Sequence, residues 1–269
     1  MANKNQKPVT PVVKPFLKGN PTDERTGKGA MAFFGILLII VLMTFIVCSM
    51  ITMNSGVLRI LLNAAVEVLV LVILYNSAAG RGAEAVARGE ILYQKQERGQ
   101  PYTEGEKAVC YHPLKGYLIG LLGTLPLLVC ALVLAVTAQR QTTGPGVLPG
   151  WLSSYQQRSD VGNALAAYQV QGGLGLEDAL RLIVRIAVMP FVSMIGAENR
   201  DGMLLLERLS PLAVLLPACA YGTGYLQGRR ERTRIHTGIA ESDRRRVRRE
   251  RKARKARLAP KPKTPQQLN

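Results

Sequence analysis

Three polar side chains stand inside an apolar stretch, and one of them is a carboxylate that could exchange a proton or bind a cation. Arg59, Asn63 and Glu67 are four residues apart, so a helix places them on one face as a polar stripe. An ionisable group inside a membrane span is expensive and usually faces a bundle interior, a cavity or a partner. The polar stripe therefore indicates either a transport or protonation site, or a glutamate whose polar contacts hold helices together.

A second set of charges follows the same spacing later in the chain. Glu177, Arg181 and Arg185 are four residues apart, which predicts an amphipathic helix with Arg181 and Arg185 on its polar face. Only about 16 residues separate Arg181 from Glu198, and Pro190 falls among them. We therefore expect an interfacial or re-entrant segment rather than a span. Arg185 is a candidate partner for the polar stripe.

The densest charge lies beyond the last apolar run. Residues 229–263 contain 12 Arg and 4 Lys against 4 acidic residues, a net +12 out of the total of +17. Such a tail can lie on anionic lipid headgroups or bind RNA, the ribosome or an acidic protein. Apolar residues are too few for deep insertion. The candidate lipid- or RNA-binding residues are Arg244, Arg245, Arg246, Arg248, Arg249, Arg251, Lys252, Arg254, Lys255 and Arg257.

Motifs for catalysis are absent from the sequence. It has no GxxxxGK[ST] phosphate loop, no HExxH and no GxSxG, the patterns that place phosphate, zinc or a nucleophile. Cys110 and His112 are two residues apart, but no second pair of ligands accompanies them, so we expect no metal site. The sequence predicts no cofactor and no enzymatic activity.

Four apolar stretches must position these groups. They predict an all-α, polytopic membrane bundle of about four transmembrane helices, because a helix of roughly 20 apolar residues crosses the hydrocarbon core. Ser210 as cap and Pro211 at the first helical position predict where the last helix starts. The predicted spans are about residues 30–53, 57–76, 116–137 and 209–226.

The polar segments complete the predicted organisation. A proline-rich, disordered arm (residues 1–29) precedes the transmembrane domain (residues 30–228), and a polybasic tail (residues 229–269) follows it. The first two spans are followed by a helical excursion, residues 77–115. An external segment, residues 138–208, lies between the third and fourth spans and carries the interfacial or re-entrant helix.

Two local signals refine this organisation. Thr103 followed by Glu106 fits a capping box at the start of a short helix. Gly116 and Gly120 form a pair of small residues one turn apart, which would let another helix approach closely.

The distribution of Lys and Arg predicts the orientation. Every lysine lies in the arm, in residues 77–115 or in the tail, whereas residues 138–209 hold six arginines balanced by six acids. Basic residues flanking spans stay in the cytoplasm. The sequence therefore predicts a multi-pass protein of the plasma or inner membrane, with both termini in the cytoplasm. A fifth span at residues 181–197 would put one terminus on the wrong side.

Two functional hypotheses remain open from sequence. The first is a non-enzymatic scaffold or assembly factor whose polybasic tail contacts anionic lipid, RNA, the ribosome or an acidic protein. The second is a subunit of a transporter or channel that uses the polar stripe around Glu67. Four spans are few for a transporter, so the second hypothesis requires a homo-oligomer or a larger complex.

Overall fold

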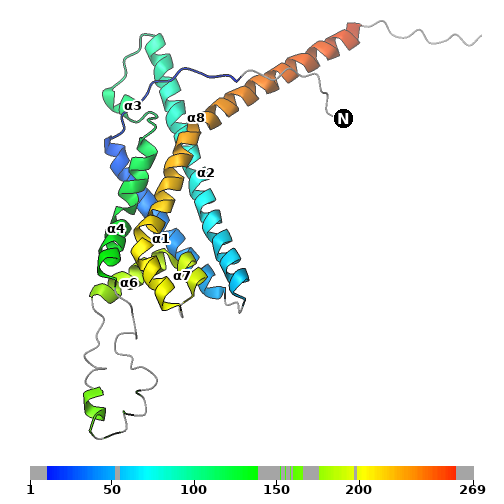
Figure 1. The fold of residues 1–269 in the computed structure, drawn as a ribbon. Coiled ribbons are helices and arrows are strands. Elements are labelled where there is room, and N and C mark those ends of the chain that lie inside the picture. Colours follow the sequence, from blue (N-terminus) through cyan, green and yellow to red (C-terminus); the bar gives the residue numbers. More distant parts are fainter. Residues whose placement is uncertain are drawn as a thin grey trace, which may run out of the picture.

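The computed structural model describes residues 11–51, 55–138, 176–196 and 199–258, with short pieces between residues 152 and 165. Within this part of the chain the regular structure is helical and no strand occurs. The labelled helices, drawn in Figure 1, are α1 (Glu24–Met50), α2 (Gly56–Glu97), α3 (Glu104–Ala108), α4 (Lys115–Thr137), α6 (Leu176–Ala187), α7 (Met189–Ile195) and α8 (Arg200–Leu258).

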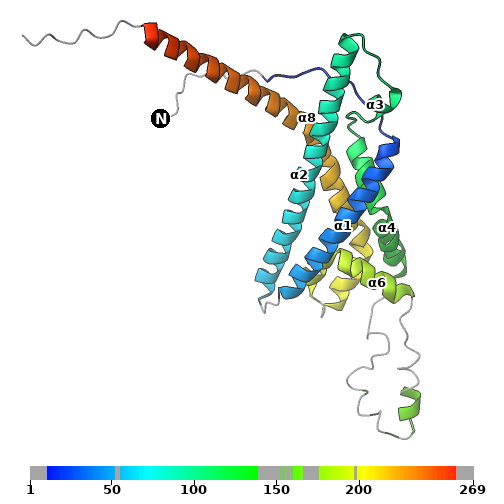
Figure 2. The same cartoon turned by 180° about the vertical axis from the view of Figure 1, so that it is seen from behind.

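Among the described helices, α1, α2, α4 and α8 are long and apolar enough to cross a membrane. They run alternately down and up the bundle, so that α1 begins and α8 leaves at the same end (Figures 1 and 2). The short helix α3 lies at that end, and α6 and α7 lie at the other. The predicted all-α architecture with four membrane-length helices is confirmed.

Aromatic and small residues fill the inside of the bundle. Phe33 and Tyr221 are buried with their ring centroids 4.6 Å apart, and Tyr111 stacks on Tyr225 at 5.5 Å. The outward face is different, because large apolar side chains such as Leu42 remain exposed along the long helices. An apolar exterior of this extent is stable against lipid rather than water.

Glycines set the closest helix crossings. A Cβ on Gly82 of α2 would overlap the carbonyl oxygen of Tyr225 on α8, so only glycine fits there. On α4, a Cβ on Gly120 would lie 2.9 Å from the carbonyl oxygen of Ala218. The close approach predicted for Gly116 and Gly120 is therefore confirmed, and α8 is the helix that packs against them.

The polar segment after the second apolar run is built as the sequence indicates. The helix α2 continues beyond its apolar part to Glu97 and is followed by Gly99, whose φ is +69°. The capping box of α3 is present, since Thr103 Oγ1 accepts from the Glu106 amide and the Glu106 carboxylate accepts from the Thr103 amide. The extension of α2 and the short helix α3 both lie at the end of the bundle where α1 begins.

The N-terminal region differs from the expected disordered arm of residues 1–29. Residues 1–10 lie outside the described residues, but residues 11–22 follow a defined non-helical path, and α1 already begins at Glu24. We refer to residues 11–22 as the N-terminal segment. Its prolines prevent helix formation, yet its free backbone groups bond to neighbouring elements. The Leu17 amide donates to the Gly89 carbonyl at 3.1 Å.

The start of the last long helix also differs from the prediction. The helix α8 begins at Arg200, and Ser210 and Pro211 lie inside it. Proline has no amide hydrogen to donate to the carbonyl four residues earlier, which here belongs to Glu207. The Ser210 hydroxyl donates to that carbonyl instead, at 2.8 Å. This replacement lets the helix continue through Pro211.

Candidate functional site

The polybasic region is a continuation of the fourth membrane-length helix. A single helix, α8, runs from Arg200 to Leu258, and every side chain between Ser242 and Arg254 is exposed. We refer to residues 242–254 as the basic helix. Ion pairs one turn apart support its helical form, with Glu241 and Arg245 at 2.6 Å. The charges are thus presented on a stiff rod that is continuous with the bundle.

Basic side chains surround this rod on every side. Residues 242–254 hold eight basic and two acidic residues, and a turn of 100° per residue spreads them around the whole circumference. Val247 is exposed and no apolar face forms. Thirteen residues span about 20 Å, and Figure 1 shows this end of α8 leaning away from the bundle. The side chains of Lys255 and Arg257 lie outside the described residues.

The polar stripe does not act as one surface. Asn63 is fully buried and donates its amide to the Arg59 carbonyl at 2.8 Å. The Asn63 Oδ1 and Arg59 Nε atoms are buried without a hydrogen-bond partner among the described residues. The Arg59 guanidinium lies against Gly196, since a Cβ there would be 2.9 Å from its Nη2. Arg59 and Asn63 therefore make their contacts with each other and with the residue that follows α7, and not with Glu67.

Glu67, the third member, lines a cavity of about 30 Å³. The cavity lies between α1, α2, α4, α6, α7 and α8, and Thr44 is the other polar side chain in its wall. Within the described part of the chain, no hydrogen bond or ion pair reaches the Glu67 carboxylate. A cavity of this size holds about one or two water molecules. It is therefore a local site and not an open pathway.

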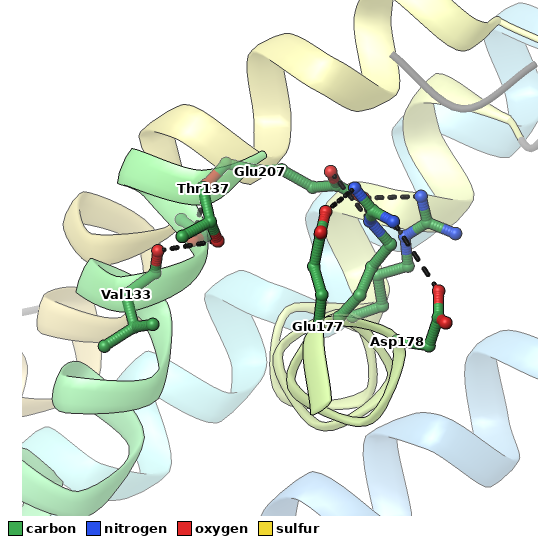
Figure 3. A network of polar contacts seen from close by, with 8 residues as sticks. Val133, Thr137, Glu177, Asp178 and Glu207 are labelled. Carbon is green, nitrogen blue, oxygen red and sulfur yellow. Dashed lines mark hydrogen bonds and ion pairs between the residues drawn. The ribbon is translucent and has the colours of Figure 1, made fainter. Parts of the chain in front are cut away.

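Arg181 and Arg185 lie inside an ion-pair network with an acid from α8. Glu207 is 3% exposed; its carboxylate lies 3.0 Å from Arg181 Nε and 2.5 Å from Arg185 Nη2. Glu177 and Asp178 join the network from α6, as Figure 3 shows beside Thr137 of α4. The suggestion that Arg185 pairs with the polar stripe is corrected, because its partner is Glu207.

Sequence reasoning missed Glu207, although a signal was present. Glu207 follows the apolar run at residues 203–206 directly. An acid at the end of such a run usually needs a buried partner, and two arginines of one helix face were already available. The predicted span began at about residue 209 and left Glu207 outside it, whereas α8 begins at Arg200 and brings Glu207 to α6.

A second buried cluster joins α2 and α8 beyond the apolar part of the bundle. Arg232 donates to Glu90 Oε2 at 2.9 Å, and His236 Nε2 lies 2.8 Å from Glu90 Oε1. Glu90 and His236 are both buried. The residues are more than 140 positions apart in sequence, so no local pattern pointed to this contact.

A buried ion pair fixes the start of two other helices. Lys115 Nζ, at the start of α4, lies 2.8 Å from Asp23 Oδ2, and Asp23 caps α1 through Thr26. Burial raises the pKa of Asp23, but the hydrogen bonds from Lys115 and Thr26 outweigh it, so the pKa lies below its ordinary value of 3.8. The carboxylate is therefore held in its charged form.

The described residues offer no cluster for a metal ion. No group of three or more His, Cys, Asp and Glu side chains comes together within the described ranges. Cys110 is buried, and burial raises the pKa of its thiol above the ordinary value. Its Sγ donates to the Glu106 carbonyl at 3.6 Å. This cysteine is a protonated packing residue and not an activated thiolate.

Comparisons with known proteins give no match among family models, curated proteins or solved structures. The function must therefore be inferred from the residues and their geometry.

Proposed function

We propose that this protein is a non-enzymatic membrane scaffold that holds structured RNA, including that of the ribosome, at the cytoplasmic face through its basic helix. The observation that carries the proposal is that α8 passes from the bundle into residues 242–254 as one helix with basic side chains all around it. A ligand bound there is held at a fixed distance from the membrane.

The distribution of charge favours RNA over a flat anionic surface. A helix lying on a membrane or on an acidic protein surface can place only about half of its circumference against that surface. Basic residues on every side match a groove whose two walls both carry phosphates. Seven of the eight basic residues are arginine, whose guanidinium binds phosphate in a bidentate way. A membrane-surface helix would also need an apolar face.

The orientation supports a cytoplasmic ligand. The N-terminal segment, α3 and the basic helix lie at one end of the bundle. They belong to the arm, to residues 77–115 and to the tail, which together hold every lysine of the sequence. By the bias of basic residues toward the cytoplasm, this end faces the cytoplasm of a plasma or inner membrane. Both termini then lie inside the cell, where RNA is available.

The opposite end supports a re-entrant element. The helices α6 and α7 have 12 and 7 residues, each too short to cross a hydrocarbon core. Arg181 of α6 is 5% exposed and pairs with Glu207 of α8. We propose that α6 and α7 enter the outer end of the bundle and return, with their charges neutralised by this ion pair.

The test uses the full chain in nanodiscs of phosphatidylcholine, which carry no net charge. Binding of a labelled RNA hairpin is measured by fluorescence anisotropy across a salt series. The variant Arg244→Gln, Arg246→Gln, Arg248→Gln should bind at least tenfold more weakly. Its salt slope should fall by roughly 0.9 for each phosphate that the variant no longer neutralises.

The matched control Lys14→Gln, Lys18→Gln, Arg229→Gln removes the same charge elsewhere and should retain RNA affinity. Equal weakening by both variants would overturn the proposal. Binding of polyglutamate as tightly as RNA would assign the basic helix to an acidic protein instead, and binding only to nanodiscs containing phosphatidylglycerol would assign it to lipid.

A second candidate function is a proton-coupled subunit of a transporter or channel complex, and the cavity at Glu67 favours it. Glu67 lines a space between six helices and has no ion pair among the described residues, and a buried carboxylate of this kind can take up a proton. Glu67→Gln should abolish proton flux into liposomes, while the exposed Glu97→Gln should leave it unchanged. Equal flux from wild type and Glu67→Gln would exclude this function.

A further inference from the structure

The N-terminal segment and α8 border an open surface hollow whose charged lining residues are all basic. The hollow has a volume of about 460 Å³, within the range of sites that hold small ligands. We refer to it as the basic hollow. Its lining residues are Val13, Lys14, Pro15, Phe16, Lys18 and Arg229.

The three cations of the basic hollow lack acidic partners. Within the described residues, no ion pair forms at Lys14, Lys18 or Arg229, and no acidic side chain lines the space. Lys14, Lys18 and Arg229 are exposed, so water screens part of the repulsion between these like charges around one hollow. An arrangement of this kind becomes favourable when an anion occupies the space between them.

The hollow is a built site because the N-terminal segment is fastened on both sides of it. The Val12 amide donates to Thr237 Oγ1 at 3.1 Å, and the Leu17 amide donates to the Gly89 carbonyl at 3.1 Å. These contacts fix the stretch that carries Lys14. The Phe16 ring lies under the Arg229 guanidinium, 5.7 Å from centroid to Cζ. The positions of the cations therefore do not depend on a freely moving arm.

The position of the hollow indicates the source of the anion. Tyr225 is buried at the end of the apolar part of α8, and Arg229 lies one turn beyond it. One helical turn is about 5.4 Å, a displacement that leads from the hydrocarbon boundary into the layer of lipid headgroups. Lipid phosphates stand at this depth, at the cytoplasmic end under the orientation proposed above.

We propose that the basic hollow binds a phosphate group, and specifically the headgroup phosphate of an anionic phospholipid of the cytoplasmic leaflet. Lys14 and Lys18 approach it from the N-terminal segment and Arg229 from α8. The site is separate from the basic helix and does not depend on RNA binding. It rests on the proposed membrane orientation only for the choice of leaflet.

Native mass spectrometry of the full chain, released from detergent with added phosphatidylglycerol or phosphatidylcholine, tests the proposal. The wild type should retain one phosphatidylglycerol and no phosphatidylcholine. Lys14→Gln, Lys18→Gln, Arg229→Gln should weaken retention by about fivefold per cation, or roughly 100-fold in all. Arg244→Gln, Arg246→Gln, Arg248→Gln removes the same charge and should retain the lipid. Equal loss in both variants would show unspecific attraction and overturn the site.

A second pair of variants tests the geometry without changing any charge. A Cβ on Gly89 would lie 2.6 Å from the Leu17 carbonyl oxygen, whereas a Cβ on Gly80 of the same helix meets nothing within 4 Å. Gly89→Ala should therefore displace the N-terminal segment and reduce retention of phosphatidylglycerol, and Gly80→Ala should not. Unchanged retention in Gly89→Ala would contradict a built site.

Inorganic phosphate distinguishes the two sources of a phosphate group. Inorganic phosphate at about 1 mM and about 10 mM would occupy a weak anion site. At both concentrations it should leave the bound phosphatidylglycerol in place. Displacement of the lipid at these concentrations would assign the basic hollow to a soluble phosphate and overturn the lipid assignment.

Discussion

The imidazole Nε2 of His236 lies 2.8 Å from Glu90 Oε1, and both side chains are buried between α2 and α8. The other carboxylate oxygen of Glu90 accepts two hydrogen bonds from Arg232. These contacts tie the part of α8 that precedes the basic helix to the extension of α2. The direction in which the basic helix leaves the bundle is therefore set by a polar cluster and not only by apolar packing.

Replacing Glu90 should loosen this connection. Glu90→Gln removes the charge that satisfies Arg232, and it leaves buried polar groups poorly paired. The free energy of unfolding should fall by about 1–3 kcal/mol. Thermal unfolding in detergent measures the decrease, and limited proteolysis should then cut near residue 236 more rapidly. Glu97→Gln, an exposed change on the same helix, serves as control; equal stability of the two variants would contradict the role of the cluster.

Replacing Glu207 should have a larger effect. Glu207→Gln leaves Arg181 and Arg185 near each other without the carboxylate that joins them, and removal of one partner from a buried ion pair costs about 3–5 kcal/mol. We expect poor yield and a lower unfolding temperature than for Glu90→Gln. The triple variant Arg181→Met, Arg185→Met, Glu207→Leu should recover much of the stability, because it removes the buried charges of this network. If the triple variant were as unstable as Glu207→Gln, the fold would require the charges themselves.

The ion pair of Asp23 and Lys115 predicts sensitivity to acid. The pKa of Asp23 is lowered in the folded protein, so its contribution is fully present above the ordinary value of 3.8 and is lost as the pH falls through the lower folded pKa. The unfolding temperature should therefore drop as the pH is lowered below about 4. Asp23→Asn should be less stable at neutral pH and should show a smaller drop. Glu104→Gln, an exposed change, should keep the wild-type profile.

Continuity of α8 should matter for RNA binding. Ala240→Pro removes a backbone hydrogen bond and costs about 3 kcal/mol in a helix interior, so α8 should divide before the basic helix. No charge changes, and the salt slope should stay the same. The affinity for an RNA hairpin should nevertheless fall several-fold, because part of the binding free energy is then needed to hold the loosened basic helix in place against the RNA. The control Ala240→Gln preserves the helix and should bind RNA like the wild type. Wild-type affinity of Ala240→Pro would show that continuity of α8 does not matter for binding.

The sequence predicted features that depend on local spacing. The four apolar helices, the capping box at Thr103 and Glu106, and the close packing at Gly120 all follow from residues within a few turns of one another. Helical periodicity and the cost of polar groups in lipid determine such features directly.

Features that join distant segments were not predictable in the same way. The contact of Glu90 with His236 and that of Asp23 with Lys115 connect different helices, and nothing in the local pattern names the partner. The start of α8 was missed for a local reason, because the Ser210 hydroxyl replaces the hydrogen bond that Pro211 cannot make. The path of the N-terminal segment was missed because its stability comes from backbone bonds to other elements.

The hydrogen bond between Val12 and Thr237 joins residues that are 225 positions apart, and this fixes an order of events during synthesis. The N-terminal segment leaves the ribosome before α8 and cannot close against it until Thr237 has been translated. At about 5–20 residues per second, the delay is on the order of ten to fifty seconds. Closure of the N-terminal segment over α8 therefore requires that α8 has been synthesised, and a product that stops before α8 lacks this contact.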